Sequence, residues 1–150
     1  MLTPSLTGWR TQYDRMHRSY ARVTGQYTSS VAYDDDLHHF MQDCWHLKDW
    51  IKYDSLAGIG DSIEGEVHAY KSLRIIADLA NGSKHLNRKQ NREGAYVTST
   101  NVTVHLGQAC PIDVDYVATL SDGTCTSAEV LVHEAAKDWD VLLGKLGLIH

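Results

Sequence analysis

The sequence lacks the features that would assign it to several large classes of protein. It has 3 cysteines, an odd number with no Cys-x-x-Cys pair, which argues against a disulfide framework and favours free thiols in a reducing compartment. No apolar run approaches the roughly 20 residues that span a bilayer. Residues 1–6 have neither the basic nor the apolar region of a signal peptide. We therefore expect a cytoplasmic protein that does not enter a membrane.

The sequence also lacks a strong catalytic signature. It contains no clear metal-binding, nucleotide-binding or catalytic-triad motif, so we expect no metal and no other cofactor. The formal net charge of -5 argues against a general nucleic-acid coat, although a local basic site is compatible with that sum. With 150 residues and 43% of them hydrophobic, the chain is long enough to bury one core, so we treat residues 1–150 as a single domain.

What the sequence does contain is a clear helical pattern at both ends. Apolar side chains recur at alternating steps of three and four residues, which places them on one face of a helix. The expected helices cover residues 9–24, 34–51, 61–80 and about 135–146. The second is expected to begin at the acidic triplet 34–36, because acids in a first turn complement the helix dipole. Cys44 lies on the apolar seam of this helix and is interpreted as a small buried hydrophobe.

Between the third and fourth helices the pattern changes to that of β-strands. Residues 96–106 are rich in Val and Thr, and residues 112–120 alternate between apolar and polar side chains. Residues 121–124, Ser-Asp-Gly-Thr, are typical of a hairpin turn, and a third strand is expected from Cys125 to about Val132. The sequence thus predicts an α+β fold, a four-helix bundle with a three-stranded antiparallel β-meander inserted before the C-terminal helix.

Two groups of polar residues recur at helical spacing and allow two interpretations each. The first is a stripe of three arginines in the first helix, Arg15, Arg18 and Arg22. It is either a solvated edge or a surface that contacts phosphates. The second group has spacings found in helical metal sites, and it consists of His39, Asp43, His46, Glu64 and His68. We favour a polar flank or surface pair for this group over a metal site.

The most informative stretch is Ala77–Leu86, because it joins an amide, a cation and an imidazole within five residues. His85 titrates near neutral pH and is the candidate general acid or base. Asn81, one turn earlier, is the candidate to fix a phosphate or to orient the imidazole. Lys84 and Arg88 are candidates for binding substrate, because cations stabilise the negative charge of a phosphate. This combination suits metal-free cleavage of RNA, whereas the alternative is a structural junction between the helices and the sheet.

The path of the backbone decides between these alternatives. Asn81-Gly82 is a common way to end a helix, with the chain leaving at Ala80. The helix can also continue through Gly82 at a cost of about 1 kcal/mol. A continuous helix would align one polar stripe that consists of Arg74, Asp78, Asn81, His85 and Arg88. In that case Arg74 is a further candidate for binding substrate.

Two resemblances add to this interpretation. Residues 40–51 and 77–86, which contain His-Leu-Lys-Asp-Trp and Ala-Asp-Leu-Ala-Asn-Gly-Ser-Lys-His-Leu, resemble a group of small prokaryotic and phage proteins with no established activity. More distantly, Asn81 and His85 resemble the motif of HEPN domains, in which an arginine and a polar residue precede a histidine. HEPN domains are helical bundles of toxin and defence systems, and many are dimeric RNases. Here the arginine position is Ala80, and the β-meander would be an insertion.

The resemblance implies a HEPN-like protein of a phage, mobile-element or defence context that binds RNA or is a degenerate RNase. Because the first two helices carry exposed aromatic or basic stripes, we also expect a homo-oligomer, with a homodimer as its simplest form. The alternative is a non-catalytic helical interaction protein with no enzymatic site. Because the arginine is missing, the sequence leaves open whether the protein is an enzyme, and it identifies no protein partner.

Overall fold

The computed structural model of the protein describes residues 8–84, 96–104, 112–120 and 122–150. These residues form five α-helices, a short 3-10 helix and three strands. In chain order the elements are α1 (Trp9–Val23), α2 (Ser30–Tyr53), η2 (Gly60–Ser62), α3 (Ile63–Val67), α4 (Lys71–Lys84), β1 (Tyr96–Val104), β2 (Ile112–Thr119), β3 (Cys125–Ser127) and α5 (Ala128–Lys145). Helices and sheet together confirm the predicted α+β class.

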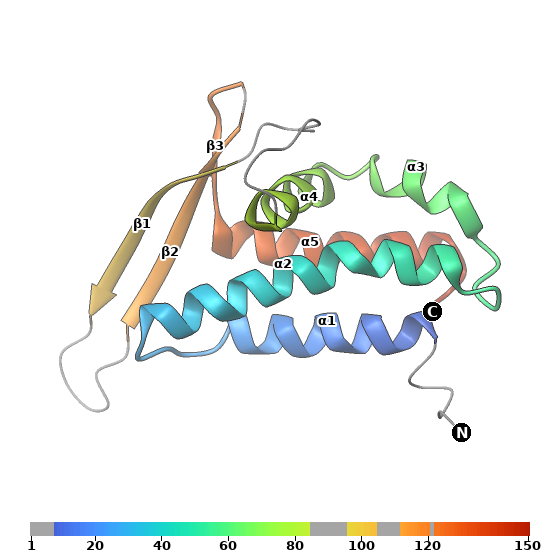
Figure 1. The fold of residues 1–150 in the computed structure, drawn as a ribbon, viewed down its shortest axis with the longest axis horizontal. Coiled ribbons are helices and arrows are strands. Elements are labelled where there is room, and N and C mark those ends of the chain that lie inside the picture. Colours follow the sequence, from blue (N-terminus) through green and yellow to red (C-terminus); the bar gives the residue numbers. More distant parts are fainter. Residues whose placement is uncertain (1–7, 85–95, 105–111, 121) are drawn as a thin grey trace.

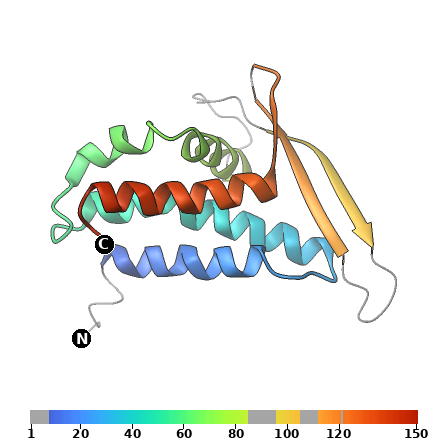
Figure 2. The same cartoon turned by 180° about the vertical axis from the view of Figure 1, so that it is seen from behind.

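Of the four longer helices, three are aligned and the fourth, α4, is not. Figure 1 shows α1, α2 and α5 side by side along the long axis, with α4 viewed nearly end-on and the sheet at one end. Figure 2 shows the same arrangement from behind. α4 packs on both α2 and α5. α4 thus crosses the direction of the other three helices, and the predicted four-helix bundle is not confirmed.

The reason for this crossing is a break in the third predicted helix. Instead of one helix over 61–80, the structure has α3, which ends at Val67, and α4, which begins at Lys71. Between them the backbone N–H of Ala69 and of Tyr70 each bond to a carbonyl three residues earlier, at 3.2 Å. This tight turn lets α3 cover the end of α2 while α4 takes a new direction. The apolar pattern of residues 61–80 fits α3 and α4 equally well, so it did not reveal the break between them.

α2 begins earlier than its acidic triplet indicated. Ser29 is the N-cap residue, and its hydroxyl accepts a hydrogen bond from the backbone N–H of Ala32 at 3.3 Å. The predicted start at 34–36 is therefore wrong by one turn. A serine cap satisfies free N–H groups at the end of a helix directly, whereas an acidic residue in the second turn gains little from the helix dipole.

The strands pair in the order β1-β2-β3, and both pairings are antiparallel. β1 and β2 are in register from Tyr96 opposite Thr119 to Val104 opposite Ile112, with a bulge between Val97 and Ser99. The turn between β2 and β3 closes with a hydrogen bond from the N–H of Leu120 to the carbonyl of Thr124 at 2.8 Å. β2 is thus the central strand of the sheet.

The third strand is much shorter than the sequence indicated. β3 ends at Ser127, and the hydroxyl of Ser127 accepts a hydrogen bond from the N–H of Val130 at 3.1 Å as the N-cap of α5. The prediction of a strand up to Val132 is therefore wrong. Short apolar runs fit a strand and a buried helix equally well, and here the serine cap decides for the helix.

The core lies between the helices and under the sheet. Its largest fully buried side chains are Trp139, Phe40, Met16, Leu47, Ile51, Ile63, Leu73, Ile76, Leu131, Leu142 and Leu143. Cys44 is also fully buried, and burial raises the pKa of its thiol well above the ordinary value. This confirms its interpretation as a buried hydrophobe. Among the described helices, none is both long enough and apolar enough to cross a membrane.

Candidate functional site

The helix that carries the candidate site continues through Asn81 and Gly82. α4 ends at Lys84, so the prediction of a continuous helix is confirmed as far as this residue. The alternative, a helix that ends at Ala80, is wrong. His85 and Arg88 lie outside the described residues, and their alignment with Asn81 stays a prediction.

Asn81 and Arg74 lie on α4 but make separate contacts. The amide of Asn81 donates to the carbonyl of Ala77 at 2.8 Å, within its own helix. The guanidinium of Arg74 donates to the carbonyl of His68 at 2.5 Å. Because His68 precedes α4, this contact holds Arg74 toward the N-terminal end of the helix, away from Asn81. The structure therefore does not bring Arg74 to the amide of Asn81.

Ala80, which stands where the HEPN motif has its arginine, faces the core. Ala80 is fully buried, and its carbonyl accepts a hydrogen bond from the amide of Gln42 on α2 at 2.7 Å. An arginine here would have to displace packed side chains of α2. The departure from the HEPN motif thus has a structural counterpart, because the side chain at position 80 is fully buried, where alanine fits and a long cation does not.

Polar contacts as well as apolar packing hold α4 in place. Ser72, which is 4% exposed, donates to a carboxylate oxygen of Asp138 on α5 at 2.6 Å. Asp78 is 3% exposed. Together with the contact from Gln42 to Ala80, the bond from Ser72 ties α4 to both neighbouring helices. Asn81 and Lys84 therefore extend from a helix that is fixed at several points.

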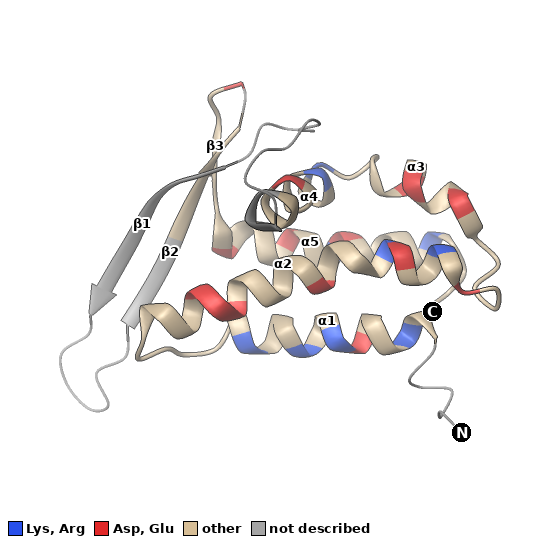
Figure 3. Cartoon of the chain, in the orientation of Figure 1, with Lys and Arg blue, Asp and Glu red and all other residues tan. Residues whose placement is uncertain are grey.

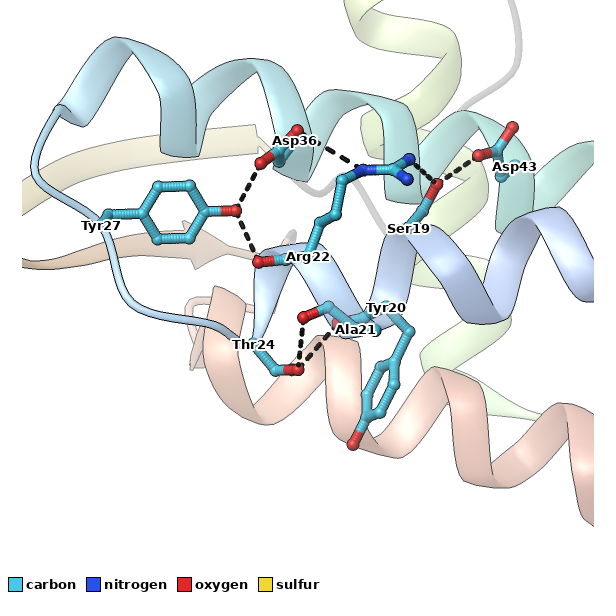
Figure 4. A network of polar contacts seen from close by, with 8 residues as sticks. All are labelled: Ser19, Tyr20, Ala21, Arg22, Thr24, Tyr27, Asp36 and Asp43. Atoms are coloured by element: carbon cyan, nitrogen blue, oxygen red, sulfur yellow. Dashed lines mark hydrogen bonds and ion pairs between the residues drawn. The ribbon is translucent and has the colours of Figure 1, made fainter.

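The arginine stripe of α1 is partly used within the protein. Figure 4 shows Arg22 between two elements: its Nη2 donates to the hydroxyl of Ser19 at 3.0 Å, and its Nε lies 3.8 Å from a carboxylate oxygen of Asp36. Tyr27 donates to the other oxygen of Asp36 at 2.6 Å. Ser19 in turn donates to Asp43. This network joins α1 to α2 and occupies the guanidinium of Arg22.

Arg15 is held in a similar way. It donates to the amide oxygen of Gln12 at 2.6 Å and lies over the ring of Trp50, 5.7 Å from its centroid. Gln12, which is 1% exposed, donates to the backbone carbonyl of Asp43 at 2.9 Å. Figure 3 shows the basic residues spread along α1. Since two of its three arginines have partners, the stripe is mainly a structural edge rather than a phosphate site.

A second polar cluster, which sequence reasoning missed, joins α1 to α5. Asp140 accepts a hydrogen bond from the hydroxyl of Tyr13 at 2.8 Å and lies 3.4 Å from Nε2 of His17. The hydroxyl of Tyr20 and Nδ1 of His133 are 2.6 Å apart. Spacing alone places the three α1 residues on one face, but no local signal shows that they meet α5. This cluster bridges two helices with aromatic and titratable side chains.

The environment of Tyr13 in this cluster leads to a testable prediction about stability at alkaline pH. Burial, and then the hydrogen bond to Asp140, raise the pKa of Tyr13 to about 12. Burial and the hydrogen bond to Asp34 likewise raise the pKa of Tyr116 to about 12. An unfolded tyrosine titrates near 10, so the fold favours both neutral phenols. The stability from them is fully present below about pH 10 and is lost as the pH rises to about 12.

Absorbance titration of the phenolates checks this prediction. We expect a late step that Tyr13→Phe reduces, and a shallower loss of stability of this variant between about pH 10 and 12. Tyr53→Phe is the control, because Tyr53 is 78% exposed and should leave the late step intact. Ionisation of all tyrosines in one step near pH 10 in the folded protein would contradict the proposed environment.

The residues considered for a metal site have other partners. Asp43 accepts from Ser19, and Glu64 forms ion pairs with Lys48 at 3.1 Å and Lys52 at 3.6 Å. In the part of the chain that the structure describes, no group of three or more His, Cys, Asp or Glu side chains is placed to hold a metal ion. The described geometry thus lends no support to the metal interpretation of His39 and His68.

An open hollow of about 260 Å³ lies at the C-terminal end of α2. It is lined by Asp49, Trp50, Tyr53 and Asp54. Both carboxylates have partners within the protein, since Asp49 pairs with Lys48 at 2.6 Å and Asp54 accepts from the N–H of Trp9 at 2.9 Å. Cations also lie against its two aromatic rings, Arg15 over Trp50 and Lys52 over Tyr53. The charged groups of the hollow are thus engaged with one another.

No family model, curated protein or solved structure matches this chain.

Proposed function

We propose that the protein is a HEPN-like RNA-binding protein of a phage, mobile-element or defence context. RNA would bind at the C-terminal end of α4 and along the basic stretch that follows it, with Asn81, Lys84, His85 and Arg88 as contact residues. Neither a cofactor nor a membrane enters the proposal. The protein would act in the cytoplasm, in keeping with the burial of the free thiol of Cys44.

The observation that carries this proposal is the continuity of α4. Because α4 runs to Lys84, Asn81 and Lys84 lie on one continuous helix, and Lys84 directly precedes His85. Lys84, the last residue of α4, is followed by three more cations at positions 88, 89 and 92 before the first acid at 93. A local run of this sign attracts a phosphate backbone even when the net charge of the protein is negative.

Ala80 bears on whether the protein also cleaves RNA. Its burial leaves no room for the arginine of the HEPN motif, and Arg74 is held toward His68. We therefore favour a binding protein or a degenerate RNase over an efficient nuclease. Incubation of RNA with the protein and with His85→Ala, without metal, tests this. If the unmodified protein cleaves RNA and His85→Ala does not, the protein is a nuclease. If neither protein cleaves RNA, only the RNA-binding function remains.

A non-catalytic structural role is the second candidate, and one contact favours it. The amide of Asn81 already bonds to the carbonyl of Ala77, which makes it a possible stabiliser of α4. The structural role predicts that Asn81→Ala and His85→Ala lower the melting temperature. A lost hydrogen bond costs about 0.5–1.5 kcal/mol net, and the higher helix propensity of alanine returns only a few tenths of a kcal/mol at position 81. The RNA-binding role predicts little change in melting temperature together with a loss of affinity.

RNA binding by charge variants makes the main functional prediction. We expect Lys84→Gln with Arg88→Gln to weaken binding of single-stranded RNA and to flatten the dependence of log affinity on log salt by about 1.4, since each lost phosphate contact contributes about 0.7. Fluorescence anisotropy over a salt series measures both. Asn81→Ala and His85→Ala should also weaken binding, with melting temperatures close to that of the unmodified protein.

The matched control removes two exposed cations elsewhere, with Lys71→Gln and Lys137→Gln. It should leave the salt dependence nearly unchanged. Equal losses in the two double variants would show non-specific attraction and contradict the proposed surface. A lower melting temperature of Asn81→Ala with unchanged affinity would favour the structural role.

A further inference from the structure

The two edges of the sheet differ in a way that points to a partner. β3, at one edge, has three residues, whereas β1, at the other edge, has nine. Both Figure 1 and Figure 2 show β1 as the outermost strand of the sheet, and β1 also contacts α4. Within the described ranges, β1 pairs only with β2. One edge of the sheet is thus short and the other is long.

β1 lacks the charged residues and prolines that usually protect an edge strand. Its sequence, Tyr-Val-Thr-Ser-Thr-Asn-Val-Thr-Val, contains no charged residue and no proline, and six of its nine residues are Val or Thr. Proteins commonly blunt edges with short strands, lysines or prolines, because an open edge is a template for pairing. Its bulge, between Val97 and Ser99, lies near one end and leaves Ser99–Val104 regular. The regular part is therefore suited to pairing.

We propose that β1 is a homodimerisation edge, at which two copies of the chain pair antiparallel to form one continuous sheet. In an antiparallel strand every second residue directs its N–H and C=O to the same side. The residues of β1 that do not bond to β2 can therefore bond to another strand. A two-fold axis perpendicular to the sheet, beside one residue near the middle of Ser99–Val104, makes the two copies equivalent and satisfies both edges at once.

Charge and closure favour a second copy as the occupant. An uncharged strand meets no like charge when it pairs with itself, although the whole protein has a net charge of -5. The combined sheet would have the order β3-β2-β1-β1-β2-β3. Its outer strands would be the three-residue β3 strands, which are too short to recruit further copies. β2, which continues beyond β3, packs against α5 and α2. Pairing through β1 thus ends at a dimer instead of continuing into a fibre.

Proline substitution at two adjacent positions tests the proposal. Proline removes one N–H, which an edge strand tolerates where that N–H faces away from the sheet. Because directions alternate, one of Asn101→Pro and Val102→Pro loses a bond to β2, and the other loses only the free-edge donor. We expect the unmodified protein to be a dimer. The proline variant that loses only the free-edge donor should be folded and monomeric. Circular dichroism reports folding, and light scattering on a sizing column reports mass.

Neutral controls and a second measurement complete the test. Asn101→Ser and Val102→Thr keep the N–H and should stay dimeric. Hydrogen exchange of the unmodified protein over a dilution series should show protection of the alternate amides in residues 99–104 that do not bond to β2. This protection should be lost as the dimer dissociates, and the measurement holds even if both proline variants unfold. A monomer at all concentrations, a folded proline pair that stays dimeric, or a dimer without protection in β1 would overturn the proposal.

Discussion

Trp139→Ala is expected to destabilise the protein by about 3–5 kcal/mol. Trp139 is fully buried on α5, and its indole N–H donates to the backbone carbonyl of Cys44 on α2 at 3.1 Å. The substitution removes the largest fully buried side chain, leaves a cavity between two helices and removes their buried hydrogen bond. Since whole domains are stable by about 5–15 kcal/mol, the loss is a large share of the total.

Urea denaturation measures this effect as a lower midpoint with an unchanged slope. Val141→Ala on the same helix is the matched control, because Val141 is 51% exposed and should change the stability by no more than about 0.5 kcal/mol. Trp139→Phe keeps part of the ring and loses the N–H, so its effect should lie between the two. Equal midpoints for Trp139→Ala and Val141→Ala would mean that α5 does not pack as described.

Asp43→Ala is expected to destabilise the protein by about 1–3 kcal/mol. Asp43 accepts the hydroxyl of Ser19, which is fully buried between α1 and α2. Without the carboxylate, the hydroxyl hydrogen of Ser19 loses its acceptor in a place that water does not reach. An unsatisfied buried donor costs more than the net value of the bond itself. The effect should therefore exceed that of removing an ordinary surface acid.

Asp35→Ala supplies the comparison, because Asp35 is an exposed acid on the same helix. Both variants gain the helix propensity of alanine, and only Asp43→Ala breaks the α1–α2 network. A double-mutant cycle with Ser19→Ala isolates the pair, for which we expect a coupling of about 1 kcal/mol. Additive effects of the two substitutions would show that Ser19 and Asp43 do not stabilise each other.

The candidate site was predictable in part. The spacing of residues 74–88 raised a continuous helix as one of two alternatives, and α4 confirms it as far as Lys84. Nothing in the spacing revealed that Ala80 faces α2 or that Arg74 reaches back to His68. Each of these contacts depends on an element outside the helix itself, and a helical pattern carries no information about its neighbours.

The cluster of Tyr13, His17 and Asp140 illustrates the same limit. Tyr13 and His17 are one turn apart, so their common face on α1 could be inferred. Asp140 is 127 residues further along the chain than Tyr13, and α5 shows only an ordinary polar position there. Whether the two meet depends on how α1 and α5 lie next to each other, which is decided by the packing of the whole core.

The sequence by itself determined the α+β class, the apolar faces of α1, α2 and α5, the burial of Cys44 and the hairpin between β2 and β3. These features follow from local periods and turn residues, which act over a few positions. Only the tertiary structure decided the break before α4, its crossing of the other helices, the early start of α5 and the difference between the sheet edges. They depend on contacts such as that of Trp139 with Cys44, which lie 95 positions apart, and packing over such separations leaves no local pattern.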